Sequence, residues 1–116
     1  FTTVNPGTTP ITLPVWFLWN GDDEILIYSL TNAARLRNIA ANPRVSFHLD
    51  GDGHGGEVVV LEGTAAVDVD YPPADQIPEY IDRYRGYMNA YGWTPKWFAN
   101  RYGVAIRMKI ERVRSK

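Results

Sequence analysis

The chain has 116 residues, of which 45% are hydrophobic and 13% aromatic; these values predict one globular domain over residues 1–116 and exclude a disordered chain. The formal net charge of −1 excludes the broad basic surface that binds nucleic acid or an anionic membrane. The absence of cysteine excludes disulfides, thiol nucleophiles and thiolate metal sites, and because no apolar run approaches the roughly 20 residues of a membrane helix, we expect a soluble, cytoplasmic protein.

Six segments of the chain have the β-branched, aromatic or alternating composition of strands. They span residues 1–4, 11–19, 24–29, 44–50, 57–69 and 104–111. Asn5-Pro6-Gly7 ends the first of them, and Asn20-Gly21 is a hairpin signal before the third. Pro14 predicts an edge position or a bulge, and Gly63 predicts a bend in the long fifth strand. Because the chain starts at Phe1, inside a strand and without a methionine, we also expect a leader to be missing.

Three further segments have helical patterns. Asn32 is a good N-cap for a short helix over residues 33–41. A second helix is expected between Pro72-Pro73 and Gly92, where apolar residues recur at helical spacing, and a third begins after Thr94. Because the strands are joined mostly by short turns, the pattern predicts a mainly β, α+β fold, with a six-stranded antiparallel barrel and short helices packed outside it.

Three of the expected strands are apolar on both faces, which a small barrel alone does not require. These stretches cover residues 15–19, 25–28 and 58–61. Leaving about half a dozen large outward side chains in water would forgo on the order of 10 kcal/mol, which rivals the roughly 5–15 kcal/mol that stabilises a whole domain. We therefore expect a homodimer that packs through barrel strands. The alternative is that the C-terminal helices alone cover these faces.

The sequence offers no metal site and no catalytic residue that can be singled out. The loop over residues 50–55 has acids at positions one and three of a calcium-loop pattern, but position twelve is Leu61 and strands flank the loop. His48 and His54 lie six residues apart, which is not a paired ligand spacing. Ser29 lacks the glycine elbow of a hydrolase nucleophile.

The start of the short helix is the most informative part of the chain. Ser29 and Asn32 precede its free backbone amides, Arg35 and Asn38 fall together on one flank, and Arg37 falls on the other. Oriented N–H groups, the helix dipole and a planar guanidinium all favour an anion, so these residues predict a phosphate site. The alternative is a short surface helix with two solvated arginines.

Large aromatic residues are expected close to this phosphate site. Trp16, Trp19 and Tyr28 have the flat side chains that would bind a ring system with a phosphorylated tail. They also have the composition of barrel or dimer core. Both interpretations hold together if a cofactor binds at a subunit interface, where its walls resemble a core.

Six motifs follow one another through nearly the whole chain. They are Thr9–Trp19 with Pro14-Val15-Trp16-Phe17, Ile27-Tyr28-Ser29, Arg35-Leu36-Arg37-Asn38-Ile39, Asn42-Pro43-Arg44-Val45, His48–Gly53 and Val60–Ala65. In this order they resemble the pyridoxamine 5'-phosphate oxidase-like split β-barrel proteins, and more narrowly the branch that uses an 8-hydroxy-5-deazaflavin coenzyme, F-420. The resemblance implies a split β-barrel of the FMN-binding type, and a homodimer with two cofactor sites in the grooves between its subunits.

The resemblance also implies which residues bind the cofactor. Pro14, Val15 and Trp16 would line the ring, Tyr28, Ser29 and Asn32 would lie between ring and phosphate, and Arg35, Arg37 and Asn38 would hold the phosphate and tail. Relatives often have lysine where Arg35 stands; arginine keeps the charge and changes the donor geometry. The implied reaction is hydride transfer from reduced F-420 to an unsaturated small-molecule substrate, with the protein supplying binding and orientation.

Two alternatives stay open within this resemblance. FMN also presents a flat ring and one phosphate, so the chain could be an FMN-binding oxidase or reductase. A non-catalytic carrier of the cofactor is the other alternative. Because a deazaflavin tail adds glutamates, it should need cations beyond the phosphate site, for which the candidates are Arg44, Lys96, Arg101 and Lys109.

Overall fold

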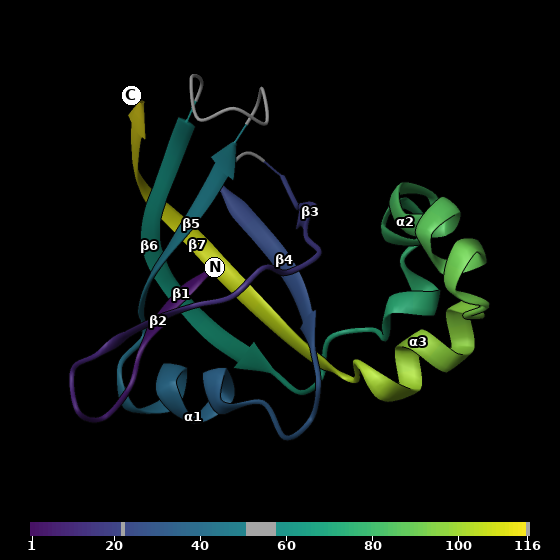
Figure 1. Ribbon diagram of the computed structural model, residues 1–116, viewed down its shortest axis with the longest axis horizontal. Helices are drawn as coiled ribbons and strands as arrows, with labels where there is room; N and C mark the ends of the chain where they lie inside the picture. The colour runs from purple at the N-terminus through teal and green to yellow at the C-terminus, as the bar shows by residue number, and fades with distance from the viewer. Residues whose placement is uncertain (22, 51–57, 116) are drawn as a thin grey trace.

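The computed structural model describes residues 1–21, 23–50 and 58–115. Within these residues, seven strands form one antiparallel sheet in the order β2-β1-β5-β6-β7-β4-β3 (Figure 1). They are β1 (Thr2–Val4), β2 (Pro10–Thr12), β3 (Leu18–Trp19), β4 (Glu24–Ser29), β5 (Arg44–Asp50), β6 (Val58–Asp68) and β7 (Val104–Ser115). The predicted mainly β, antiparallel architecture is confirmed, with one strand more than the six expected.

The additional strand arises because the expected strand over residues 11–19 is interrupted. Residues 13–17 belong to neither β2 nor β3. Pro14 lies in this gap, and its missing N–H cannot contribute to a strand ladder. A continuous strand over residues 11–19 was therefore a wrong prediction, and the chain crosses from one edge strand of the sheet to the other in this segment.

A β-bulge bends the longest strand pair of the sheet. The register of β6 against β7 shifts between Glu62 and Gly63. A Cβ atom at Gly63 would lie 1.8 Å from the carbonyl oxygen of Lys109, so only glycine allows the two backbones to approach this closely. The predicted bend at Gly63 is confirmed, and it curves the sheet into a barrel.

Within the described residues, the helices are α1 (Ala34–Ala41), the 3₁₀ turn η1 (Ala74–Gln76), α2 (Pro78–Tyr91) and α3 (Pro95–Arg101). We call η1, α2 and α3 the helical lobe; it stands beside the barrel in Figure 1. The N-cap of α1 is Ala33, without a side-chain cap, so the prediction of Asn32 as N-cap was wrong by one residue. In α3 the cap is as expected, since Thr94 Oγ1 accepts a hydrogen bond from the Trp97 amide (3.0 Å). Among the described helices, none is long and apolar enough to cross a membrane.

Two hydrophobic clusters share strand β4. Ile25 and Ile27 face the barrel interior, whereas Leu26 and Tyr28 face the helical lobe. All four side chains are buried within the single chain. For this strand the C-terminal helices therefore cover the outer face, which is the alternative to a dimer. The homodimer stays a prediction, and β4 gives it no support.

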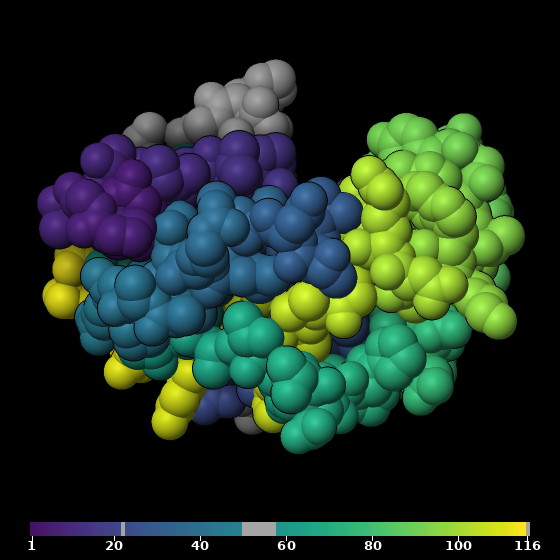
Figure 2. Space-filling model, turned by 90° about the horizontal axis from the view of Figure 1, so that it is seen from below, coloured from purple at the N-terminus to yellow at the C-terminus, as the bar shows by residue number. Residues whose placement is uncertain are grey.

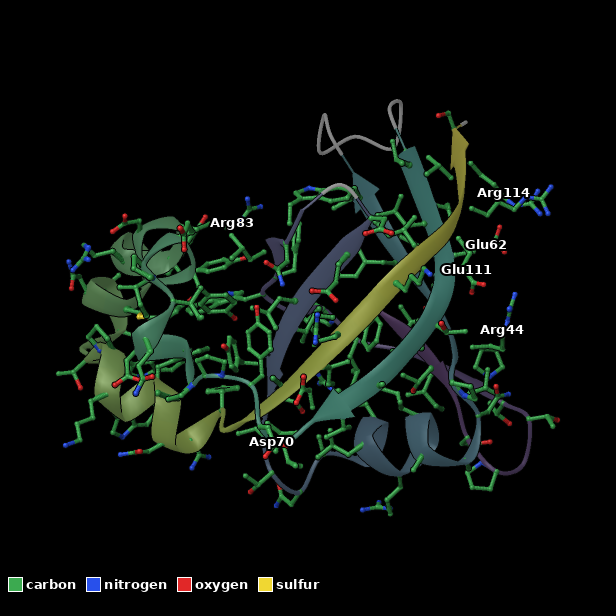
Figure 3. The ribbon with its side chains drawn as sticks, turned by 180° about the vertical axis from the view of Figure 1, so that it is seen from behind. Arg44, Glu62, Asp70, Arg83, Glu111 and Arg114 are labelled. Carbon is green, nitrogen blue, oxygen red and sulfur yellow. The ribbon has the colours of Figure 1, made fainter. Side chains whose placement is uncertain are left out.

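Charged pairs lie on the outer face of β5, β6 and β7. Arg44 pairs with Glu111 at 3.6 Å, and Arg114 pairs with Glu62. Figure 3 shows these four side chains on the barrel, away from the helical lobe. Water screens such exposed pairs, so they contribute little to stability.

Candidate functional site

A hollow of about 410 Å³ lies between the barrel and the helical lobe. Its volume falls within the range of about 300–1,000 Å³ that small-molecule sites occupy. Figure 2 shows the notch between the blue part of the barrel and the yellow-green helices. Its walls come from the segment before β3, from the end of β4 with α1, and from the helical lobe: Pro14, Val15, Trp16; Tyr28, Leu30, Arg35; and Tyr91, Trp93, Phe98, Tyr102.

The first wall is the interrupted segment between β2 and β3. Trp16 is half-buried there and its indole stacks on the ring of Tyr84, with centroids 4.5 Å apart and planes 3° from parallel. Phe98 stacks at 5.4 Å and 16°. Aromatic pairs in such geometry contribute about 0.5–1.5 kcal/mol beyond their buried area. Trp16 is therefore held as a rigid part of the wall.

The second wall carries a tyrosine whose phenol is already engaged. Tyr28 Oη donates a hydrogen bond to the carbonyl of Pro72 (2.5 Å), which ties β4 to the linker before the helical lobe. Burial raises the pKa of the Tyr28 phenol, and the neighbouring Tyr71 and Asp75 raise it further. Tyr28 is thus a neutral, fixed part of the wall rather than a base.

The same wall carries a cation. Arg35 is half-buried on α1, and burial lowers the pKa of its guanidinium against a smaller opposing effect of Tyr102. Among the residues that the structure describes, no carboxylate forms an ion pair with it. Arginine stays protonated in proteins, so the hollow presents a positive charge that lacks a counter-ion from the described chain.

The third wall is aromatic and comes from the helical lobe. Phe98 and Tyr102 stack at 4.6 Å and 15°, and Trp93 lies 4.9 Å from Tyr91. These four residues and Leu30 were not among the site residues predicted from the sequence. The density of aromatic residues in the last third of the chain was the available signal, but the sequence did not indicate which of them face residues 14–35.

Five of the nine sequence-predicted site residues line this hollow together: Pro14, Val15, Trp16, Tyr28 and Arg35. The other four do not line it. Ser29 is buried and its Oγ donates to the carbonyl of Leu30 (3.0 Å), while buried Asn38 donates from Nδ2 to Thr3 Oγ1 (3.0 Å). Asn32 and Arg37 are exposed. A direct role for these four in cofactor binding stays a prediction.

The described residues contain no metal-binding cluster, since no group of three His, Asp or Glu side chains among them could hold a metal ion. His48 lies exposed on β5 and does not line the hollow. Residues 51–57, which include His54 and most of the calcium-like loop, lie outside the described residues.

The chemistry of the walls fits a flat ring with an anionic end. Aromatic side chains on two walls can contact a ring, and Arg35 can bind a phosphate or carboxylate. The described lining residues offer phenols, indoles and a guanidinium, and there is no His, Asp, Glu, Ser or Lys among them. The arrangement can bind and orient a reactive group, and such a group must bring its own chemistry.

The family model described as pyridoxamine 5'-phosphate oxidase matches residues 1–116. The chain belongs to the pyridoxamine 5'-phosphate oxidase family. The predicted resemblance to this family is thereby confirmed, whereas the F-420 branch stays a prediction. Among curated proteins, none matches the chain significantly.

Solved structures with the fold of this pyridoxamine 5'-phosphate oxidase family member include an F-420 reductase, 22% identical over 97% of this chain and 85% of its own, with a TM-score of 0.74. A conserved hypothetical protein of Mycobacterium tuberculosis is 26% identical over 98% of this chain and 72% of its own, with a TM-score of 0.73. An FAD-binding protein of Mesorhizobium loti is 21% identical over 98% of this chain and 80% of its own, with a TM-score of 0.68. These likenesses show that the split β-barrel is shared.

Proposed function

We propose that the chain is an oxidoreductase that binds reduced coenzyme F-420 in the hollow and directs hydride transfer to an unsaturated small-molecule substrate. The observation that carries the proposal is the position of Arg35, a half-buried cation facing the aromatic walls formed by Trp16 and the helical lobe. A structural neighbour described as an F-420 reductase adds support.

The protein's part in this reaction is binding and orientation. When bound, the reduced deazaflavin supplies the hydride. The segment Pro14–Trp16 and the aromatic side chains of the helical lobe hold the ring and exclude water from it. Arg35 binds the phosphate, and Tyr28 fixes the second wall through its bond to Pro72.

Two of the predicted site residues outside the hollow would be available to the tail of the coenzyme. Asn32 and Arg37 are exposed and would be able to contact it, whereas Ser29 and Asn38 are buried and hydrogen-bonded within the chain. As the family resemblance implies, a second subunit would complete the groove in a homodimer. A sedimentation experiment at micromolar concentration tests this, and a species of only 13.1 kDa contradicts it.

FMN is the second candidate, and one observation favours it. Two of the four cations expected to hold the glutamates of a deazaflavin tail already have partners within the chain. Arg44 pairs with Glu111 on the outer face, and Arg101 stacks over Trp97 on α3. One described cation in the hollow is enough for the single phosphate of FMN.

Titration of the protein with each cofactor tests the proposal. We expect saturable quenching of tryptophan fluorescence by F-420, because Trp16 and Trp93 line the hollow. Tight binding of FMN with no binding of F-420 would overturn the proposal that the cofactor is F-420. Anaerobic incubation with reduced F-420 and a panel of enones, quinones and tetrapyrroles then distinguishes an enzyme from a carrier, since a carrier leaves the reduced cofactor unoxidised.

A further inference from the structure

The side chain of Tyr84 does not line the hollow, but it is hydrogen-bonded to the backbone of the segment that forms the first wall. Tyr84 lies buried on α2, and its Oη accepts a hydrogen bond from the Phe17 amide (2.7 Å) and donates one to the Phe17 carbonyl (2.8 Å). Arg83 Nε donates a third bond to the same oxygen (3.2 Å). A phenol has one proton and two lone pairs, so these three bonds use its whole hydrogen-bonding capacity.

The ring of Tyr84 acts on the same segment. It stacks on Trp16 at 4.5 Å and 3° from parallel, while the Arg83 guanidinium lies 4.5 Å from the centre of the Phe17 ring. Figure 3 shows Arg83 on the side of α2 that faces the barrel. Two neighbouring residues of α2 thus hold both the backbone and the side chains of the segment before β3.

The backbone of this segment has little other support. Residues 13–17 lie between β2 and β3, and within the described part of the chain residues 14–16 make no backbone hydrogen bond. Pro14 cannot donate one. The Tyr84 phenol therefore does for Phe17 what a neighbouring strand does elsewhere in the sheet, satisfying its N–H and C=O together.

We propose that Tyr84 is the positioning residue of the hollow, whose hydroxyl fixes the segment Pro14–Trp16 and so couples the helical lobe to the ring-binding wall. The expected effect of Tyr84 on ligand affinity rests on the proposed function. The expected effect of Tyr84 on the position of the Pro14–Trp16 segment does not, because the hydrogen bonds and the stacking are contacts within the chain.

The test compares Tyr84→Phe with Tyr87→Phe. Tyr87 lies on the same helix and its ring is 6.1 Å from Trp16, but it is 59% exposed and forms none of these bonds. Amide hydrogen exchange is followed by NMR at Phe17, with Ile106 at the centre of β7 as the reference for global unfolding. Tyr84→Phe is expected to speed exchange at Phe17 about tenfold relative to Ile106 and to shift the Trp16 indole signal. Tyr87→Phe is expected to leave both as in the wild type.

Cofactor titration adds the functional readout. For whichever of F-420 or FMN binds the wild type, Tyr84→Phe should weaken binding about fivefold to tenfold and Tyr87→Phe by less than about twofold. Unchanged exchange at Phe17, or unchanged affinity despite faster exchange, overturns the positioning role. If neither cofactor binds the wild type, the proposed function fails, and the Phe17 exchange and Trp16 signal alone decide whether Tyr84 holds the wall.

Discussion

The Arg35→Ala substitution removes the half-buried guanidinium from the hollow while leaving its aromatic walls in place. A hydrogen bond between charged groups contributes about 1.5–3 kcal/mol. Because Arg35 is only half-buried, water screens part of its interaction with a phosphate, and the lower end of this range applies. We therefore expect a loss of about 1.5 kcal/mol in the free energy of cofactor binding, which is about tenfold in affinity.

The same substitution should not destabilise the folded chain. Burial lowers the pKa of the Arg35 guanidinium, which means that the folded state disfavours the charge. Among the described residues no ion pair is lost with it. The urea midpoint of Arg35→Ala should equal or exceed that of the wild type, so binding and stability change in different directions, as functional residues often show.

Three variants make the assay specific. Affinity is measured by fluorescence titration with F-420 and FMN, and stability by urea unfolding. Arg35→Lys keeps the charge without the planar donor geometry and should lie between wild type and Arg35→Ala. Arg85→Ala is the matched control, because Arg85 is exposed on α2 and pairs with Asp82 (3.2 Å). Wild-type affinity in Arg35→Ala, or a urea midpoint lowered as for a core residue, would refute the reasoning.

Further predictions concern the barrel and two buried tyrosines, Tyr28 on β4 and Tyr80 on α2. Gly63→Ala places a Cβ 1.8 Å from a backbone oxygen of β7 and should lower the free energy of unfolding by about 3 kcal/mol, measured by urea denaturation; a wild-type midpoint contradicts the bulge. Asn38→Ala leaves the buried Thr3 hydroxyl unpaired, so stability should fall by about 1–3 kcal/mol while cofactor affinity stays constant; weakened binding at wild-type stability would instead place Asn38 in the site. Burial raises the pKa of Tyr28 and Tyr80, so the unfolded chain loses these protons first and stability should fall as the pH rises above about 10. Urea unfolding with phenolate absorbance checks this, and stability that stays constant while all tyrosines ionise argues against it.

The sequence predicted best those features that depend on local chemistry. Gly63 indicated the bend, and Thr94 followed by Pro95 indicated the start of α3. Both features could be predicted because each depends only on the residue and its neighbours in the sequence. Asn32 was placed one residue too early as a cap, since its own position before α1 is an exposed turn. Pro14 was recognised as a disturbance, but a bulge and a break in the strand have the same local signature.

Features that depend on tertiary packing were less accessible. The apolar residues on both faces of β4 indicated that another element packs against its outer face. Only the structure shows that this element is the helical lobe. In the same way Trp93 and Tyr102 belong to the hollow because the lobe folds back on residues 14–35, a contact that helical periodicity does not encode. Asn38 has the residue type of a phosphate ligand, and its bond to Thr3 became visible only once β1 was placed beside α1.

Crystals of the protein grown with F-420 and, in parallel, with FMN test the central claim most directly. The account predicts a flat ring in the hollow between the Pro14–Trp16 segment and the aromatic side chains of the helical lobe, with its phosphate within hydrogen-bonding distance of the Arg35 guanidinium. A ring bound elsewhere on the barrel, or a phosphate that contacts no atom of Arg35, would contradict it.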